Sequence, residues 1–211
     1  MTKALVRDYN KKKREINNRL KEFSRLGKAG DKDIFSELCF CLLTPQSKAV
    51  YCDEAVKTLK NTKVLFWGCN RRIRKYLQRV RFPNNKAKYL AGARKFFQNS
   101  AKQIDIKTKL NPKDPQATRG WLVKNVKGLG YKEASHFLRN IGMGENLAIL
   151  DVHILRNLKK YGVIDTIPPS ITKKAYLEIE KKMQRFAKKV NIPLGCLDLL
   201  FWSSQTGFIF K

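Results

Sequence analysis

Residues 126–140 read VKGLGYKEASHFLRN, and this stretch says the most about the fold. It predicts the apolar end of one helix, a tight Gly-Leu-Gly turn, and a second helix that runs to Asn140. The two glycines allow left-handed backbone angles and let another backbone come close. Amides at the start of the second helix point outward with the positive end of its dipole, so a phosphate can bind there. Most G-x-G turns simply join helices, so the turn needs support from elsewhere in the chain.

On both sides of this hairpin the chain reads as helices joined by short breaks. No segment shows the sustained two-residue alternation of a sheet, so we predict an all-α fold. Asp114, between two prolines, predicts the start of the helix that precedes the hairpin. Asp151 follows an apolar pair and suits the N-cap of a later helix. Another helix is expected to begin at Gln46 or Ser47.

The charge of the chain narrows its partners. Its 211 residues include 45 Lys and Arg against 17 Asp and Glu, a net charge of +28, with 43% hydrophobic residues for a packed core. Such an excess attracts a polyanion, either nucleic acid or an anionic membrane. No apolar run approaches the ~18 residues of a spanning helix, and the charged N-terminus is unlike a secretory signal. We therefore expect a cytoplasmic protein without a membrane-spanning helix, whose partner is nucleic acid or an anionic surface. If the partner is DNA, the protein is expected to be associated with the nucleoid in a prokaryote.

Lys132 and the segment Asp151-Val152-His153 add a second pattern to the hairpin. The spacing Gly128-x-Gly130-x-Lys132, followed by this Asp-x-His, resembles the helix-hairpin-helix DNA glycosylase superfamily. Residues 42–47, LLTPQS, are also similar to a segment of that family. Residues 131–140 and the aromatic tail that stops at Lys211 look most like the compact archaeal-type 8-oxoguanine DNA glycosylase/lyases. The resemblance covers roughly Phe35 to the C-terminus.

The resemblance implies two helical subdomains with a cleft between them and the hairpin at its mouth. We expect one subdomain to combine residues 1–33 and 143–211. The other is expected to span 34–142 and to end in the hairpin, at about 126–132. A chain of this size is expected to act as a monomer.

The implied activity is that of a bifunctional DNA glycosylase and abasic-site lyase. Lys132 matches the lysine that attacks C1′ of an extruded nucleotide, forms a Schiff base and permits β-elimination, which cuts the strand 3′ to the lesion. Burial or nearby cations such as Lys127 would favour its neutral form. Asp151 matches the carboxylate that stabilises positive charge on the sugar. The plain alternatives are a solvated lysine and a simple N-cap, and the cap is compatible with the catalytic role.

A pocket for the base is implied around four residues. His136, one helical turn after Lys132, either lines this pocket or is a core histidine with satisfied nitrogens. Trp202 and Phe210 are candidate stacking surfaces for the base, with core packing as the alternative. 8-Oxoguanine carries a hydrogen on N7 that guanine lacks, so a hydrogen-bond acceptor there discriminates between them. We expect that acceptor to be the main-chain carboxylate of Lys211.

Contacts to DNA are expected at the hairpin and at one further residue. Gly128 and Gly130 offer amides to a phosphate, and Lys124 and Lys127 add charge beside them. The resemblance implies that Gln46 is the wedge that fills the gap left by the extruded base. Its alternative is an exposed residue near an N-cap.

No redox or organic cofactor is expected, although a monovalent cation at the hairpin carbonyls is compatible with the sequence. The five cysteines are expected to be buried, reduced thiols. Only Cys196 lies beyond Asp151, too few for the iron–sulfur cluster of related branches. Two rival functions remain: the same chemistry on oxidised pyrimidines, as in endonuclease III-like enzymes, or a non-catalytic helix-hairpin-helix module that only holds double-stranded DNA.

Overall fold

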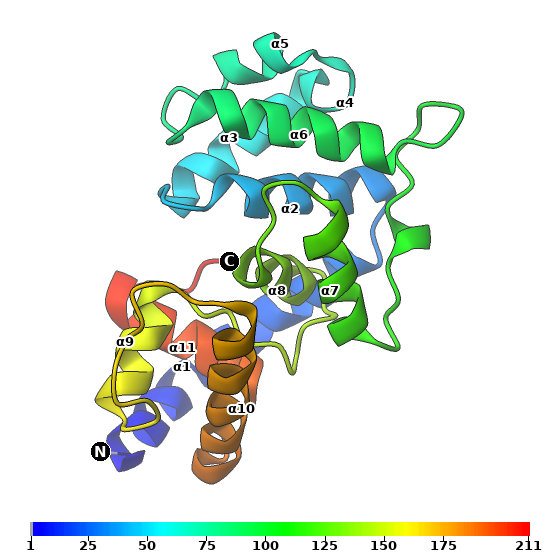
Figure 1. Ribbon diagram of the computed structural model, residues 1–211. Coiled ribbons are helices and arrows are strands. Elements are labelled where there is room, and N and C mark those ends of the chain that lie inside the picture. Colours follow the sequence, from blue (N-terminus) through cyan, green and yellow to red (C-terminus); the bar gives the residue numbers. More distant parts are fainter. Residues whose placement is uncertain (1) are drawn as a thin grey trace.

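The structure, a computed structural model, describes residues 2–211 and folds them into helices (Figure 1). The elements are, in chain order, α1 (Thr2–Gly27), α2 (Asp31–Leu43), α3 (Ala49–Asn61), α4 (Val64–Trp67), α5 (Asn70–Lys75), α6 (Pro83–Phe97), η1 (Lys107–Lys109), α7 (Pro115–Asn125), α8 (Tyr131–Asn140), α9 (Val152–Lys160), α10 (Lys173–Val190) and α11 (Leu194–Thr206). Within residues 2–211, β-type pairing is confined to one isolated bridge between Gln98 and Ile104. The predicted all-α class is confirmed.

Helix α2 is the buried centre of the first half of the chain. Every residue from Ile34 to Leu43 is buried, because this helix is apolar on nearly all sides. It packs against α3, α6 and α8. Asp31 and Asp33 lie in its first turn, where negative charge is favoured by the helix dipole.

The apolar side chains form two cores. The first is built from residues between Ile34 and Leu147, and the second joins Ala148–Ile209 to the buried face of α1. In Figure 1, α2–α6 lie at the top, α9, α10 and α11 lie at the bottom, and α7 and α8 lie between them. The first core extends to Leu147, and the division of the chain into 34–142 and 1–33 with 143–211 stays a prediction. Among the described residues, no helix is both long enough and apolar enough to cross a membrane.

Helices α7 and α8 form the hairpin that the sequence predicts. The side chain of Asp114 accepts a hydrogen bond from the amide of Ala117 at 2.9 Å, which caps α7 as expected. Gly128 has φ +88°, and Leu129 is buried between the two glycines. The turn thus needs its first glycine for a left-handed angle and its leucine for packing.

The helix expected at Gln46 or Ser47 begins later. Helix α3 starts at Ala49, Lys48 is extended, and Gln46 has a left-handed φ of 56°. Residues 44–48 therefore form a turn, and the predicted helix begins two or three residues later than expected. The side chain that holds this turn lies far away in the sequence, at Lys86.

The five thiols are free, and one differs from the expectation. Cys39, Cys41, Cys52 and Cys196 are buried, whereas Cys69 is exposed immediately before α5. Burial raises the pKa of the four buried thiols. Hydrogen bonds from backbone amides at the start of α5, first that of Arg72, lower the pKa of Cys69.

Candidate active site

A cavity of about 870 Å³ lies where the two halves of the chain meet. Its wall is formed by the turn before α3, the first turns of α8, residues 149–153, α11 and the last residues of the chain. Most of the residues proposed from the sequence line it: Gln46, Lys132, His136, Asp151, Trp202, Phe210 and Lys211. The fold therefore gathers side chains that are spread over most of the sequence.

Lys132 is the second residue of α8 and reaches the cavity from the hairpin. A quarter of its side chain is exposed, and its amine lies 3.4 Å from a carboxylate oxygen of Glu133. The other oxygen of Glu133 accepts a hydrogen bond from the amide of Gly130 at 3.2 Å. One carboxylate thus caps the start of α8 and stands beside the lysine amine.

Asp151 enters the same cavity from the start of α9. Its carboxylate accepts a hydrogen bond from the amide of Ile154 at 2.8 Å, so the predicted N-cap is confirmed. Ile149 and Leu150, immediately before it, are buried and fix its backbone. The positive end of the α9 dipole therefore lies beside this carboxylate.

His136 is buried, lines the cavity and packs edge-on against Phe40, with ring centroids 5.6 Å apart. Within residues 2–211 neither of its ring nitrogens makes a hydrogen bond of good geometry, although the main chain of Lys211 lies beside the ring. Burial, reinforced by the charges of Arg139, Lys132 and Lys211, lowers the pKa of His136 well below its ordinary value. The ring is therefore neutral and keeps hydrogen-bonding capacity for a bound molecule.

Lys211 is held by its side chain. The amine donates to Glu37 at 3.0 Å and to Asp53 at 2.6 Å, and it lies 4.3 Å from the centroid of the Phe40 ring. Burial alone would lower the pKa of Lys211, but the two carboxylates outweigh it and raise the pKa. The last residue of the chain is thereby fixed at the cavity wall.

A chain of buried polar groups continues from Glu37 beneath the cavity. Asn140 donates to Glu37 at 2.6 Å, Arg139 donates to Asn140 at 3.0 Å, and Arg139 pairs with Asp198 of α11. Burial raises the pKa of Asp198 to about 6, although Arg139 acts in the opposite direction. The sequence analysis did not predict this network of buried polar groups. Its signal was a charged residue inside a strongly apolar helix, at Glu37 and at Asp198.

Three aromatic rings from α11 and the tail meet at the cavity. Trp202 and Phe210 are nearly parallel, with centroids 6.3 Å apart and planes at 27°. Phe208, which the sequence interpretation did not single out, meets both rings edge-on. The rings offer flat apolar faces to a planar ligand.

The predicted DNA contacts lie outside the cavity wall, apart from Gln46. Lys124 and Lys127 are exposed on the hairpin. A Cβ atom on Gly128 would come within 2.5 Å of the Tyr89 ring, so this position needs glycine for space as well as for its backbone angle. Gly130 is the N-cap of α8.

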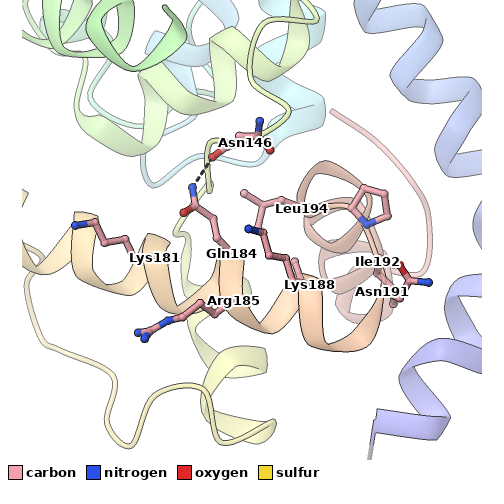
Figure 2. Close-up of a pocket in the computed structure, with 10 residues that line it drawn as sticks. Asn146, Lys181, Gln184, Arg185, Lys188, Asn191, Ile192 and Leu194 are labelled. Carbon is pink, nitrogen blue, oxygen red and sulfur yellow. Dashed lines mark hydrogen bonds between the residues drawn. The ribbon is translucent and has the colours of Figure 1, made fainter.

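A second hollow, of about 860 Å³, lies along α10 and the start of α11. In Figure 2 the amide of Gln184 donates to the carbonyl of Asn146, and the hollow is otherwise edged by Lys181, Arg185 and Lys188. It contains no carboxylate, histidine or cysteine beside these cations. The first cavity is therefore the candidate active site.

A hairpin of this form, beside a cavity that holds an amine and a carboxylate, is the arrangement of a helix-hairpin-helix DNA glycosylase. A family model described as 8-oxoguanine DNA glycosylase matches residues 16–192. The chain belongs to that 8-oxoguanine DNA glycosylase family.

Curated relatives agree with this assignment. A protein of Fusobacterium nucleatum, named 8-oxoguanine DNA glycosylase/AP lyase, is 47% identical over 205 residues, which cover 96% of this chain and 94% of that protein. A protein of Methanocaldococcus jannaschii with the same name is 37% identical, covering 93% of this chain and 91% of its own length.

Solved structures agree as well. The crystal structure of the 8-oxoguanine DNA glycosylase of Thermotoga maritima matches with a TM-score of 0.85 at 35% identity, over 100% of this chain and 98% of that one. The Methanocaldococcus jannaschii 8-oxoguanine glycosylase/lyase, in complex with a 15mer DNA containing 8-oxoguanine, matches with a TM-score of 0.86 at 33% identity, over 99% of this chain and 100% of that one. The fold is therefore shared over nearly the whole length.

Proposed function

We propose that this protein is a bifunctional enzyme that extrudes 8-oxoguanine from duplex DNA, removes it and then cuts the strand 3′ to the abasic site. The observation that carries the proposal is the meeting of Lys132 and Asp151 in one cavity, each placed there by a helix N-terminus. The family relationship supports the same activity. Because its substrate is DNA, we propose that it is cytoplasmic and nucleoid-associated, and from the size of the chain we propose that it acts as a monomer.

The first step forms a bond between the neutral amine of Lys132 and C1′ of the sugar. The base leaves with the electron pair of the glycosidic bond and takes up a proton, and the amine nitrogen loses one. Positive charge builds on the sugar as that bond breaks, and the Asp151 carboxylate stabilises it. The plain N-cap role of Asp151 holds the carboxylate in place for this purpose.

The second step cuts the strand. The C1′–O4′ bond opens to give a protonated Schiff base with Lys132, and O4′ takes up a proton. A proton then leaves C2′, and the 3′ phosphate departs with the electron pair of its bond to C3′. Water hydrolyses the Schiff base and frees the lysine, so amine, carboxylate and water suffice without a redox or organic cofactor. The monovalent cation at the hairpin stays a prediction.

Recognition of the base is assigned to other residues that line the same cavity. We propose that Trp202 and Phe210 stack on the extruded base and that His136, with its unpartnered ring nitrogens, lines the base pocket. The main-chain carboxylate of Lys211 stays the predicted acceptor for N7–H. Anchoring of its side chain by Glu37 and Asp53 supports this role, because a discriminating acceptor must be rigid.

The duplex is held from outside the cavity. We propose that the amides of Gly128 and Gly130 bind a phosphate at the start of α8, with Lys124 and Lys127 adding charge. For this the Gly130 amide exchanges its hydrogen bond to Glu133 for one to the phosphate. Gln46, exposed at the rim, is the proposed wedge for the vacated stack.

Borohydride trapping tests this proposal, because it converts the Schiff base into a stable covalent adduct. We expect an adduct on duplexes with 8-oxoguanine, its complete loss in Lys132→Gln, and no loss in the control Lys181→Gln. Trapping only on oxidised pyrimidines would reassign the substrate. No adduct on any lesion would leave a DNA-binding module.

Asp151 is tested by two substitutions that differ in capping. Asparagine caps a helix about as well as aspartate, whereas alanine loses ~1 kcal/mol of cap stability. We therefore expect Asp151→Asn to keep the unfolding free energy and yet to release base at least ~100-fold more slowly, the size of a lost transition-state contact. Asp151→Ala should lower both the unfolding free energy and the rate of base release. Normal base release by Asp151→Asn would show that Asp151 acts only as a helix cap.

A further inference from the structure

Lys86 is a buried lysine with no role in the proposed chemistry. It is the fourth residue of α6 and only 4% exposed. Its amine donates to the carbonyls of Leu43 and Pro45 at 2.6 and 2.7 Å and to the hydroxyl of Ser47 at 2.9 Å. An ammonium has three N–H donors, so all of them are used.

These contacts hold the turn that carries Gln46. Leu43 ends α2, and its carbonyl belongs to the last turn, where carbonyls lack partners within the helix. Pro45 and Ser47 flank Gln46 on either side. One amine thus joins the end of α2 to both sides of the turn.

The same turn is tied to the segment before α6. The hydroxyl of Ser47 also accepts a hydrogen bond from the amide of Arg81 at 3.0 Å. Gln46 and Phe82 are both exposed, and both have left-handed backbones, with φ 56° and 57°. Such angles are unfavourable for residues other than glycine and persist only where the surroundings hold them.

We propose that Lys86 is a positioning residue that locks the Thr44–Ser47 turn onto α6, so that Gln46 stands ready to fill the stack as the damaged base leaves. The inference rests on the proposed function and adds a residue to it. Lys86 acts through the backbone around Gln46 and contacts no reacting atom.

Burial of this charged amine lowers the stability of the fold, and we take the retention of a lysine here as support for a specific role. Its three partners are neutral oxygens, and burial lowers the pKa of Lys86 to about 8. The charged and titratable groups that face it are Cys52 of α3, Lys132 and Glu133 of α8, and Arg81 before α6. A buried methionine would avoid this desolvation cost but would remove the Lys86 donor from the Pro45 carbonyl and leave the Leu43 carbonyl and the Ser47 hydroxyl with one donor each, from Cys52 and Arg81.

The test compares two reactions of Lys86→Met. Base release from an 8-oxoguanine duplex needs extrusion, whereas trapping on a single-stranded DNA with a preformed abasic site does not. We expect base release under single-turnover conditions to fall ~10–100-fold, the usual effect of displacing a group by about 1 Å. Trapping on the single strand should stay within threefold of wild type by the same reasoning.

Two further variants serve as a control and as a second test. Lys88→Met removes an exposed lysine from the same helix and should change neither reaction. Ser47→Ala keeps the Lys86 charge but removes the hydroxyl that joins turn and helix, and it should slow base release selectively, by less than Lys86→Met. Equal loss of both reactions in Lys86→Met and Ser47→Ala, or loss of neither, would overturn the inference.

The dependence on pH separates positioning from general stability. Above pH 8 the neutral amine donates two hydrogen bonds instead of three, so the advantage of wild type over Lys86→Met in base release should narrow between pH 7 and 9. A ratio that does not change with pH would contradict this. Failure of the proposed function would look different, because wild type itself would then give no adduct on either DNA.

Discussion

Glu37 and Asp198 show how single residues shape this site. Each interrupts a strongly apolar helix, α2 or α11, and each meets a partner from the end of α8, Asn140 or Arg139. A buried carboxylate is tolerated only when it is paired, and removal of its partner leaves an uncompensated charge. α8 therefore carries the lysine at one end and organises two buried carboxylates at the other.

His136 predicts how stability depends on pH. Its folded-state pKa lies well below 6.5, so the folded protein keeps the ring neutral while the unfolded chain takes up a proton below about that pH. Stability from the neutral ring is present above pH 6.5 and is lost as pH falls, by up to ~1.4 kcal/mol per pH unit for one group. Urea unfolding at pH 7.5 and 5 should show a smaller loss for His136→Leu than for wild type. Equal losses would contradict the burial argument.

At this scale the sequence predicts residues whose role depends on local pattern. Lys132 and Asp151 follow from the hairpin and the Asp-x-His segment, and both reach one cavity. Lys86 and Arg139 could not be found in this way. Their partners lie 43 and 59 positions away, and nothing in the local sequence separates them from the other 43 Lys and Arg.

The α7–α8 hairpin gives a prediction at the scale of one element. Gly128 has φ +88° and lies against Tyr89, so Gly128→Ala is expected to lose ~1–2 kcal/mol of unfolding free energy through backbone strain and crowding. Gly120, inside α7 with open space around it, is the matched control. Gly120→Ala should gain ~0.5–1 kcal/mol, because alanine favours helix.

Urea unfolding of both variants measures the difference in unfolding free energy. The affinity of each variant for undamaged duplex, measured over a range of salt concentrations, shows whether the altered hairpin still binds DNA. Weaker binding is expected for Gly128→Ala alone. The same unfolding free energy in both glycine variants would show that the turn does not need its left-handed residue.

The elements themselves were largely predictable. Capping at Asp114 and Asp151, and the glycines of the hairpin, act within a few residues and can be read locally. The predicted helix start at Gln46 or Ser47 was wrong, because Lys86, on another helix, binds the backbone of this turn and α3 begins at Ala49. Local preference sets where a helix can begin, and tertiary contacts choose among the options.

At the scale of the whole molecule, a buried ion pair joins the two cores. Arg119 of α7 binds Glu180 of α10 through two hydrogen bonds, at 2.6 and 2.8 Å, and Glu180 also accepts from the amide of Ala148 at 2.8 Å. Both side chains are almost fully buried. The pair therefore joins α7 to α10 by a buried contact.

Substitution of one partner of this ion pair should lower the unfolding free energy more than substitution of both. Arg119→Met leaves Glu180 buried and unpaired, so we expect a loss of ~3–5 kcal/mol of unfolding free energy. Arg119→Met with Glu180→Leu should recover part of that loss, which a double-mutant cycle in urea would measure. Additive losses would show that the two residues act independently.

The division of the thiols has a practical consequence. A maleimide reacts with an exposed thiolate, and Cys69 is the exposed cysteine with a lowered pKa, while burial and raised pKa values protect the other four. The native chain thus accepts a single fluorophore at a defined position, outside the residues that line the cavity. The movement of the labelled protein along stretched DNA can then be followed one molecule at a time without introducing or deleting a cysteine.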